Sequence, residues 1–118
     1  MKTRATQRSL ELLRKNGWTV HIVEKYIKHP NMAFGKRIDV YNFGDLLACR
    51  PPTQGLPGSI ALVQCCPGAS HAEHKDKILG IPEFEIWKAA GGRVFLQSWA
   101  KKGARGEKKR WTMREEEL

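Results

Sequence analysis

The chain has 118 residues, of which 41% are hydrophobic, and this length suits one domain over residues 1–118. No apolar run approaches the roughly 20 residues of a membrane span, and no apolar segment follows the charged residues 1–4, so we expect neither a membrane protein nor a signal peptide. Lysine and arginine total 21 against 12 acidic residues, a net charge of +9, which favours a polyanion such as nucleic acid as partner. A merely soluble basic protein is the alternative.

Two further features of composition refine this picture. Three of the acidic residues, Glu115, Glu116 and Glu117, stand together near the C-terminus, so the rest of the chain is more basic than the total. The cysteines are Cys49, Cys65 and Cys66, an odd number with an adjacent pair, which disfavours a disulfide framework. We therefore expect a cytoplasmic protein.

The first part of the chain predicts one helix and one strand. Apolar and small residues at helical spacing predict a helix over residues 3–16, which Gly17 ends. Alternation then predicts a strand over residues 18–23. Residues 25–37 are basic, contain Pro30 and Gly35, and indicate a loop.

The middle of the chain predicts two strands and two helices. A strand region is predicted over residues 39–49, with residues 46–48 as its buried part. A loop rich in proline and glycine follows. After this loop, a central strand covered on both faces is predicted over residues 59–64. Ser70 and Glu73 have the spacing of a capping box, which predicts a helix over residues 71–79. Pro82 and Gly91 bracket a second helix over residues 83–90.

Two more strands, residues 93–99 and 110–114, end the series and are joined by a basic turn over residues 101–106. The order is α-β-β-β-α-α-β-β. It predicts an α/β fold with a mixed central β-sheet flanked by helices.

Candidate chemistry centres on Asp45 and Gln64. Asp45 stands where an apolar strand begins, and Gln64 ends the next apolar strand, so neighbouring strands would present the two side chains together. Oxygen ligands suit Mg²⁺, and Asp39 is a possible second carboxylate. The alternatives to a metal site are that both aspartates are turn residues and that Gln64 is a hydrogen-bonded residue at the end of a strand.

The same segments carry a family resemblance. A helix ending in Gly17-Trp18 precedes Gly44-Asp45-Leu46-Leu47-Ala48 and Ile60-Ala61-Leu62-Val63-Gln64-Cys65-Cys66. Over about residues 6–99 this pattern resembles the PD-(D/E)XK nuclease superfamily, with archaeal-type Holliday junction resolvases and small phage-encoded nuclease-like proteins as the similar members. The resemblance implies a restriction-endonuclease-like core, a metal-dependent endonuclease acting on DNA (branched or structured DNA included), and a homodimer.

The resemblance also implies roles for residues. Asp45, the residue at position 64 and the backbone carbonyl of Cys65 would hold Mg²⁺ or Mn²⁺, and a lysine two residues after the second acid would orient the attacking water. This sequence has Gln64 in place of that acid and Cys66 in place of that lysine. Lys77 or Lys75 on the following helix would replace the lysine, with His71 and His74 beside them. The family's acid on the first helix is missing from Thr6-Gln7, unless Glu11 replaces it.

Basic residues outside this segment suggest how nucleic acid is held. Phosphate contacts are expected from Lys36, Arg37, Lys75, Lys101, Lys102, Arg105, Lys108 and Lys109. A zinc site formed by Cys65, Cys66, His71 and His74 is a further possibility. It is disfavoured because adjacent cysteines on a strand point to opposite faces and cannot readily bind one ion together. Two other functions stay open: a nucleic-acid-binding module on the same fold without catalysis, and a protein-interaction domain.

Overall fold

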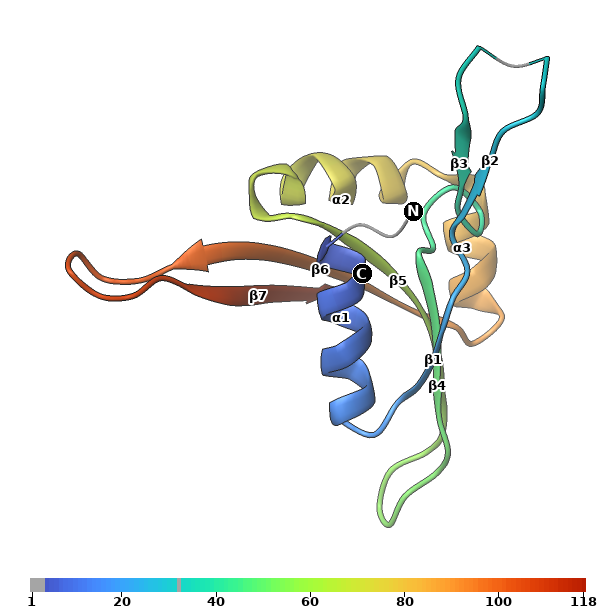
Figure 1. Cartoon of the computed structure of the whole chain (residues 1–118). Coiled ribbons are helices and arrows are strands. Elements are labelled where there is room, and N and C mark those ends of the chain that lie inside the picture. The colour runs from blue at the N-terminus through green and yellow to red at the C-terminus, as the bar shows by residue number, and fades with distance from the viewer. Residues whose placement is uncertain (1–3, 32) are drawn as a thin grey trace.

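The computed structural model describes residues 4–31 and 33–118. It contains both helices and strands, as the sequence predicts (Figure 1). In chain order the elements are α1 (Arg4–Lys15), β1 (Thr19–Ile22), β2 (Lys25–Ile27), β3 (Lys36–Ile38), β4 (Leu46–Arg50), β5 (Ser59–Pro67), the 3₁₀ turn η1 (Gly68–Ser70), α2 (His71–Leu79), α3 (Pro82–Ala89), β6 (Arg93–Lys102) and β7 (Arg110–Glu117).

A five-stranded mixed sheet organises the fold. Its strand order is β1-β4-β5-β6-β7, in which β5 and β6 run parallel and the other neighbours run antiparallel. β5 lies at the centre, and residues 61–66 are buried, because this apolar run is covered on both faces. The predicted mixed central sheet flanked by helices is confirmed.

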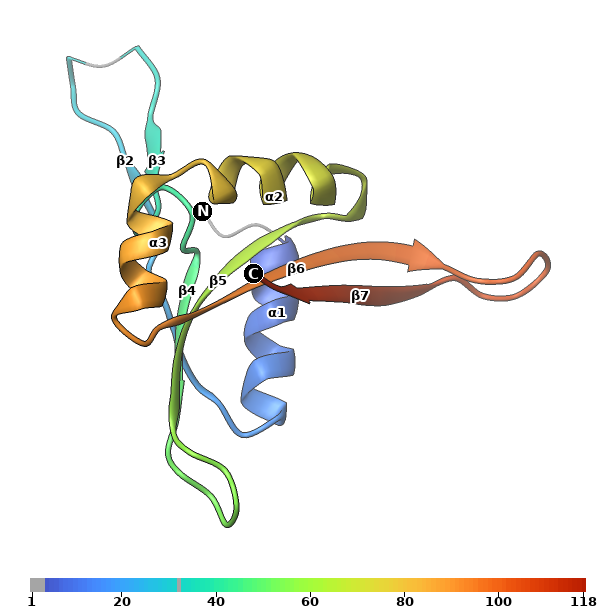
Figure 2. The same ribbon diagram turned by 180° about the vertical axis from the view of Figure 1, so that it is seen from behind.

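The helices cover both faces of the sheet. α1 packs Leu10 and Leu13 onto the face that carries Val63 and Phe95. α2 and α3 lie on the opposite face (Figure 2), where their buried apolar residues meet the other side of β5 and β6. Within the described residues no helix is both long and apolar enough to cross a membrane.

The structure corrects the prediction that residues 25–37 form a loop. β2 and β3 pair in antiparallel register, with Lys25 opposite Ile38 and Ile27 opposite Lys36, and this hairpin projects from the body of the protein (Figure 1). The residues of its two strands are mostly exposed, so they lack the alternation that marks a half-buried strand. The strand predicted over residues 39–49 is correspondingly shorter, because Tyr41 and Asn42 adopt positive φ in a turn before β4.

The predicted end of the last strand at residue 114 is also wrong. β7 continues to Glu117, because its glutamates find partners on neighbouring elements. Gln97 donates to Glu115 at 2.7 Å, Arg93 forms two hydrogen bonds with Glu117, and Glu116 contacts α2. These acids therefore belong to the sheet.

The predicted helices match closely. α2 has the predicted bounds, and α3 begins at Pro82, one residue earlier than predicted. α1 starts at Arg4 and stops one residue before Asn16. Thr3, where we expected the first helix to begin, lies outside the described residues.

Candidate functional site

Asp45 and Gln64 meet where β4 begins and β5 nears its end. Leu46 of β4 faces Val63 of β5, so the residue before Leu46 and the residue after Val63 come together. Gln64 donates its Nε2 to Asp45 Oδ2 at 2.8 Å, and the backbone N–H of Cys65 donates to the same oxygen at 2.8 Å. Both side chains are buried. The predicted juxtaposition of these two residues is confirmed.

Two more carboxylates join Asp45 from the base of the β2–β3 hairpin. Glu24 directly precedes β2 and Asp39 directly follows β3, so the antiparallel pairing brings them together. The backbone N–H of Glu24 also donates to the Asp45 carbonyl at 3.3 Å. One carboxylate oxygen from each of Glu24, Asp39 and Asp45 lies within 4.8 Å of the other two, an arrangement that could hold a metal ion. We call these three residues the acidic triad.

The acidic triad places like charges together in a poorly solvated place. The pKa of Asp45 is raised to about 8, chiefly by burial; the hydrogen bond from the Cys65 N–H opposes the rise, and the charges of Asp39 and Glu24 add to it. The nearest described cation to the Glu24 carboxylate is Arg37, whose Nε lies 3.8 Å away. A buried cluster of this kind favours either protons or a cation.

Several oxygens of the site have no hydrogen-bond partner among the described residues. They are both carboxylate oxygens of Glu24, Oδ1 of Asp39 and Oε1 of Gln64, and all are buried. Buried polar atoms without a partner are rare and need a reason. The donor set, three carboxylates and one amide oxygen, fits a hard divalent cation.

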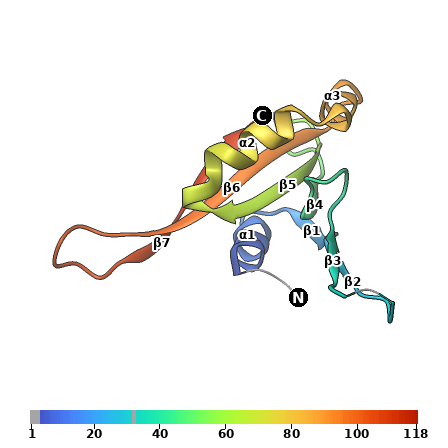
Figure 3. The ribbon, with the colours of Figure 1, turned by 90° about the horizontal axis from the view of Figure 1, so that it is seen from above.

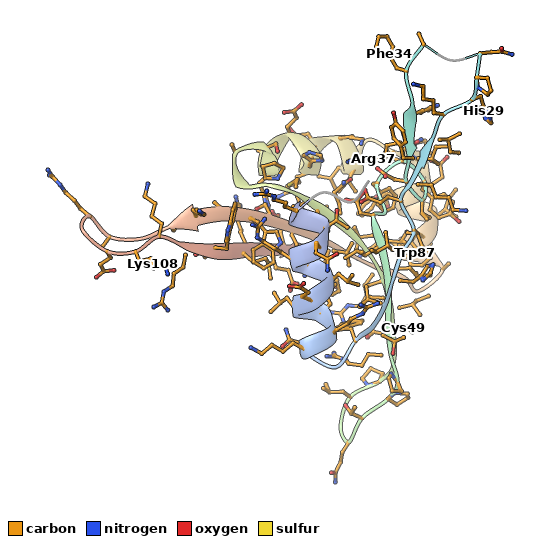
Figure 4. All side chains as sticks on the ribbon, in the orientation of Figure 1. His29, Phe34, Arg37, Cys49, Trp87 and Lys108 are labelled. Atoms are coloured by element: carbon orange, nitrogen blue, oxygen red, sulfur yellow. The ribbon has the colours of Figure 1, made fainter. Side chains whose placement is uncertain are left out.

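A cleft of about 480 Å³ opens beside the acidic triad. Besides Asp39, Asp45 and Gln64, its walls include Arg4, Ala5, Arg37, Cys65, Cys66, Pro67, His74 and Lys77. Figure 4 shows Arg37 at the base of the β2–β3 hairpin, whose tip carries His29 and Phe34. The cleft thus combines a carboxylate end with the side chains of two arginines, a lysine and a histidine.

His74 and Lys77 enter the cleft from α2. The Nδ1 atom of His74 is buried and has no hydrogen-bond partner among the described residues. Burial lowers the pKa of His74, the neighbouring charge of Lys77 lowers it further, and so the ring is biased towards the neutral form. Lys77 lines the same cleft as Asp39 and Asp45.

Other expected site residues lie elsewhere. His71 is buried with Nδ1 2.7 Å from Ser98 Oγ and Nε2 2.9 Å from Glu116 Oε1, so both ring nitrogens are engaged away from the cleft. His71 is therefore not among the residues that line the cleft. Lys75 likewise pairs with Glu116. Glu11 lies exposed on α1, where it accepts a hydrogen bond from Gln7 at 3.2 Å.

The two neighbouring cysteines do not form a metal pair. Cys65 packs with the α1 side of the core and Cys66 with the α2 side. Burial raises the pKa of both thiols, and so both stay protonated at neutral pH. The contact of Cys65 with Asp45 comes from its amide N–H. The expectation that the Cys65 carbonyl binds the metal stays a prediction.

Glu24 is the residue that the sequence did not reveal. Its signal was available only after the pairing of residues 25–27 with residues 36–38 was known, because that pairing sets Glu24 beside Asp39.

Comparison of the chain with protein-family models, curated proteins and solved structures gave no match.

Proposed function

We propose that this protein is a metal-dependent phosphodiesterase that cleaves DNA, with a variant PD-(D/E)XK site on a restriction-endonuclease-like core. The observation that carries the proposal is the convergence of the acidic triad with the unpartnered Gln64 Oε1 at one end of a cleft that Arg4, Arg37 and Lys77 also line. This pairing of a carboxylate cluster with nearby cations is what phosphodiester hydrolysis requires.

The residues fit Mg²⁺ or Mn²⁺ better than a softer ion. Glu24, Asp39 and Asp45 would hold the cation together with the amide oxygen of Gln64, since all four offer oxygen. When bound there, a divalent cation would supply Lewis-acid polarisation of the phosphoryl group and a water of lowered pKa. Glu24 would provide the third acid that neither the first helix nor position 64 provides.

The remaining cleft residues would act on the phosphate and on protons. Lys77 would place its ammonium group beside the charge that develops on the phosphoryl oxygens. His74, biased towards its neutral form, would accept a hydrogen bond or a proton at Nδ1. Arg4 and Arg37 would bind phosphates next to the scissile one.

A second candidate function is nucleic-acid binding without catalysis. The replacement of the family's second acid by Gln64 and of its lysine by Cys66 favours it. The two candidates share the binding surface and differ only in cleavage.

A cleavage assay separates them. Supercoiled plasmid, linear duplex and branched DNA are incubated with the wild-type protein and Mg²⁺ or Mn²⁺, beside Asp45→Asn and the matched control Asp76→Asn, whose side chain is exposed on α2. We expect cleavage by the wild type and Asp76→Asn and at least roughly 100-fold less by Asp45→Asn. Cleavage that survives in Asp45→Asn contradicts the site, and binding without cleavage under both metals favours the second function.

A further inference from the structure

The net positive charge of the chain lies in two hairpins. The β2–β3 arm (residues 25–38) contains four basic residues and no acidic one, and the β6–β7 arm (residues 101–111) contains six basic residues and one acidic residue. The rest of the chain has eleven of each sign. The whole formal charge of +9 therefore belongs to these two arms.

Both arms extend beyond the body of the protein. Figure 1 shows the β6–β7 arm and the β2–β3 arm pointing in different directions, and the view from above in Figure 3 shows both reaching past the face of the sheet that α1 covers. The radius of gyration is 15.7 Å, against about 13.5 Å for a compact domain of this length. The acidic triad lies at the base of one arm.

The basic side chains of the arms are available to a partner. All ten are exposed. Of these ten, Arg37 alone forms an ion pair with a carboxylate among the described residues. Lys108 extends into solvent from the β6–β7 arm (Figure 4). Such unpaired cations attract phosphates.

Contacts at the bases of the arms hold them in place. The guanidinium of Arg8 on α1 lies 3.5 Å from the ring centroid of Trp111, which ties the β6–β7 arm to the helix. At the base of the other arm the backbone N–H groups of Val23 and Glu24 donate to the Asp45 carbonyl at 3.0 and 3.3 Å. Within that arm the ring of Tyr26 lies over Gly35 so closely that a Cβ at Gly35 would clash with it. Arms held in this way lose little conformational freedom when they bind.

We propose that the two arms grip a DNA duplex that lies across the cleft at the base of the β2–β3 arm. A duplex is stiff, so arms held apart can each contact its phosphates, whereas a flexible single strand gains little from their fixed spacing. The longest dimension of the protein, 49 Å, corresponds to about 14 base pairs at roughly 3.4 Å per pair. This inference deepens the proposed function and rests on it for the role of the cleft.

Binding is measured in EDTA, so that cleavage plays no part. The ligands are a fluorescent 16-base-pair duplex and one of its single strands, titrated at several salt concentrations with the wild type, Lys28→Glu, Lys108→Glu and the double variant. Lys15→Glu, an exposed charge reversal near the end of α1 and outside both arms, is the matched control. Circular dichroism confirms that each variant is folded.

We expect the duplex to bind more tightly than the single strand, and each arm variant to weaken duplex binding about tenfold at low salt. Each lost phosphate contact should reduce the slope of log K against log salt by about 0.9. The two effects should add in the double variant, and Lys15→Glu should change affinity less than about twofold. Tighter binding of the single strand, with bases stacked on Phe34 or Tyr26, overturns the proposal.

An effect from one arm only, or arm variants that match Lys15→Glu, overturns it as well. Failure of the proposed function looks different: the duplex then binds through both arms in EDTA, but no DNA is cut when Mg²⁺ or Mn²⁺ is added.

Discussion

Gln64 donates its amide Nε2 to Asp45 Oδ2 at 2.8 Å, while its own Oε1 is buried without a hydrogen-bond partner among the described residues. One side chain thus stabilises the carboxylate of Asp45 and leaves an oxygen available at the acidic triad. A glutamate at this position could not donate in its ionised form. The amide therefore limits the number of like charges in the site and still offers an oxygen ligand.

This relationship predicts opposite effects of Gln64→Glu with and without metal. Without metal, two carboxylates would meet at hydrogen-bond distance and could not both ionise, so the variant should be less stable by about 1–3 kcal/mol. With Mg²⁺ or Mn²⁺ the added charge should tighten metal binding about tenfold or more. Thermal unfolding in EDTA and in a metal titration measures both effects.

Gln64→Met is the control for the size of the side chain. It should lose stability without gaining metal affinity, because a thioether neither donates to Asp45 nor suits a hard cation. A Gln64→Glu variant that is as stable as the wild type in EDTA and binds metal no more tightly would show that position 64 does not face the acidic triad.

A second prediction concerns Asp45→Asn. An asparagine removes a charge that burial disfavours, so the variant should be more stable than the wild type in EDTA at pH 8. The wild type should gain stability when metal is added, by about 2.7 kcal/mol at a hundredfold excess over Kd, and the variant should gain much less. Thermal unfolding with and without Mg²⁺ measures both. Equal metal-induced shifts in the two proteins would place the ion elsewhere.

The pair Asp45 and Gln64 was predictable because of simple strand geometry. Each residue stands at the polar end of an apolar run, and two adjacent antiparallel strands bring such ends to the same level of the sheet. The helices were predictable for a similar reason, since proline, glycine and the Ser70–Glu73 spacing mark their ends in the sequence. In the structure Ser70 makes no side-chain cap hydrogen bond with α2 and donates instead to the Pro67 carbonyl.

The hairpin that completes the acidic triad was not predictable in the same way. β2 and β3 expose both of their faces, so no hydrophobic alternation distinguishes them from a loop. The predicted end of β7 fell short of Glu117 for a related reason. The last residues of this strand are held by ion pairs with residues distant in sequence, which a local pattern does not show. In both places long-range pairing, which local pattern does not record, decides the structure.

The stability of the metal-free protein should depend on pH through two acids, Glu116 and Asp45, that have opposite effects. Hydrogen bonds from Lys75 and His71 lower the pKa of Glu116 to about 2, so its contribution is complete above about pH 4.5 and is lost as pH falls towards 2. The pKa of Asp45 is raised from 3.8 to about 8, so the folded state holds this proton more tightly and stability is lost as pH rises from about 4 to 8. The metal-free protein should therefore be most stable near pH 4–5.

Thermal unfolding in EDTA between pH 3 and 9 checks this profile. The lowered pKa of His74 works against the fall near pH 6, and so the comparison with Asp45→Asn is needed to isolate the aspartate. The variant should lose less stability than the wild type between pH 5 and 8. Saturating Mg²⁺ should reduce the loss in the wild type, because a cation then replaces the proton. Parallel profiles of the two proteins in EDTA would contradict the assigned origin.

The last prediction distinguishes two lysines of α2 that lie two residues apart. Lys77 lines the cleft, whereas Lys75 pairs with Glu116 on β7. Lys77→Met should lower kcat about 100- to 1000-fold, because a cation beside the phosphoryl charge acts mainly in the transition state, and should change the Kd for DNA little. Lys75→Met should leave kcat near the wild-type value and lower the melting temperature, because Glu116 loses one of its partners. Single-turnover cleavage, DNA binding in EDTA and thermal unfolding of both variants provide the comparison. If Lys75→Met loses activity and Lys77→Met retains it, the cation that assists the reaction does not come from the cleft wall formed by α2 at Lys77.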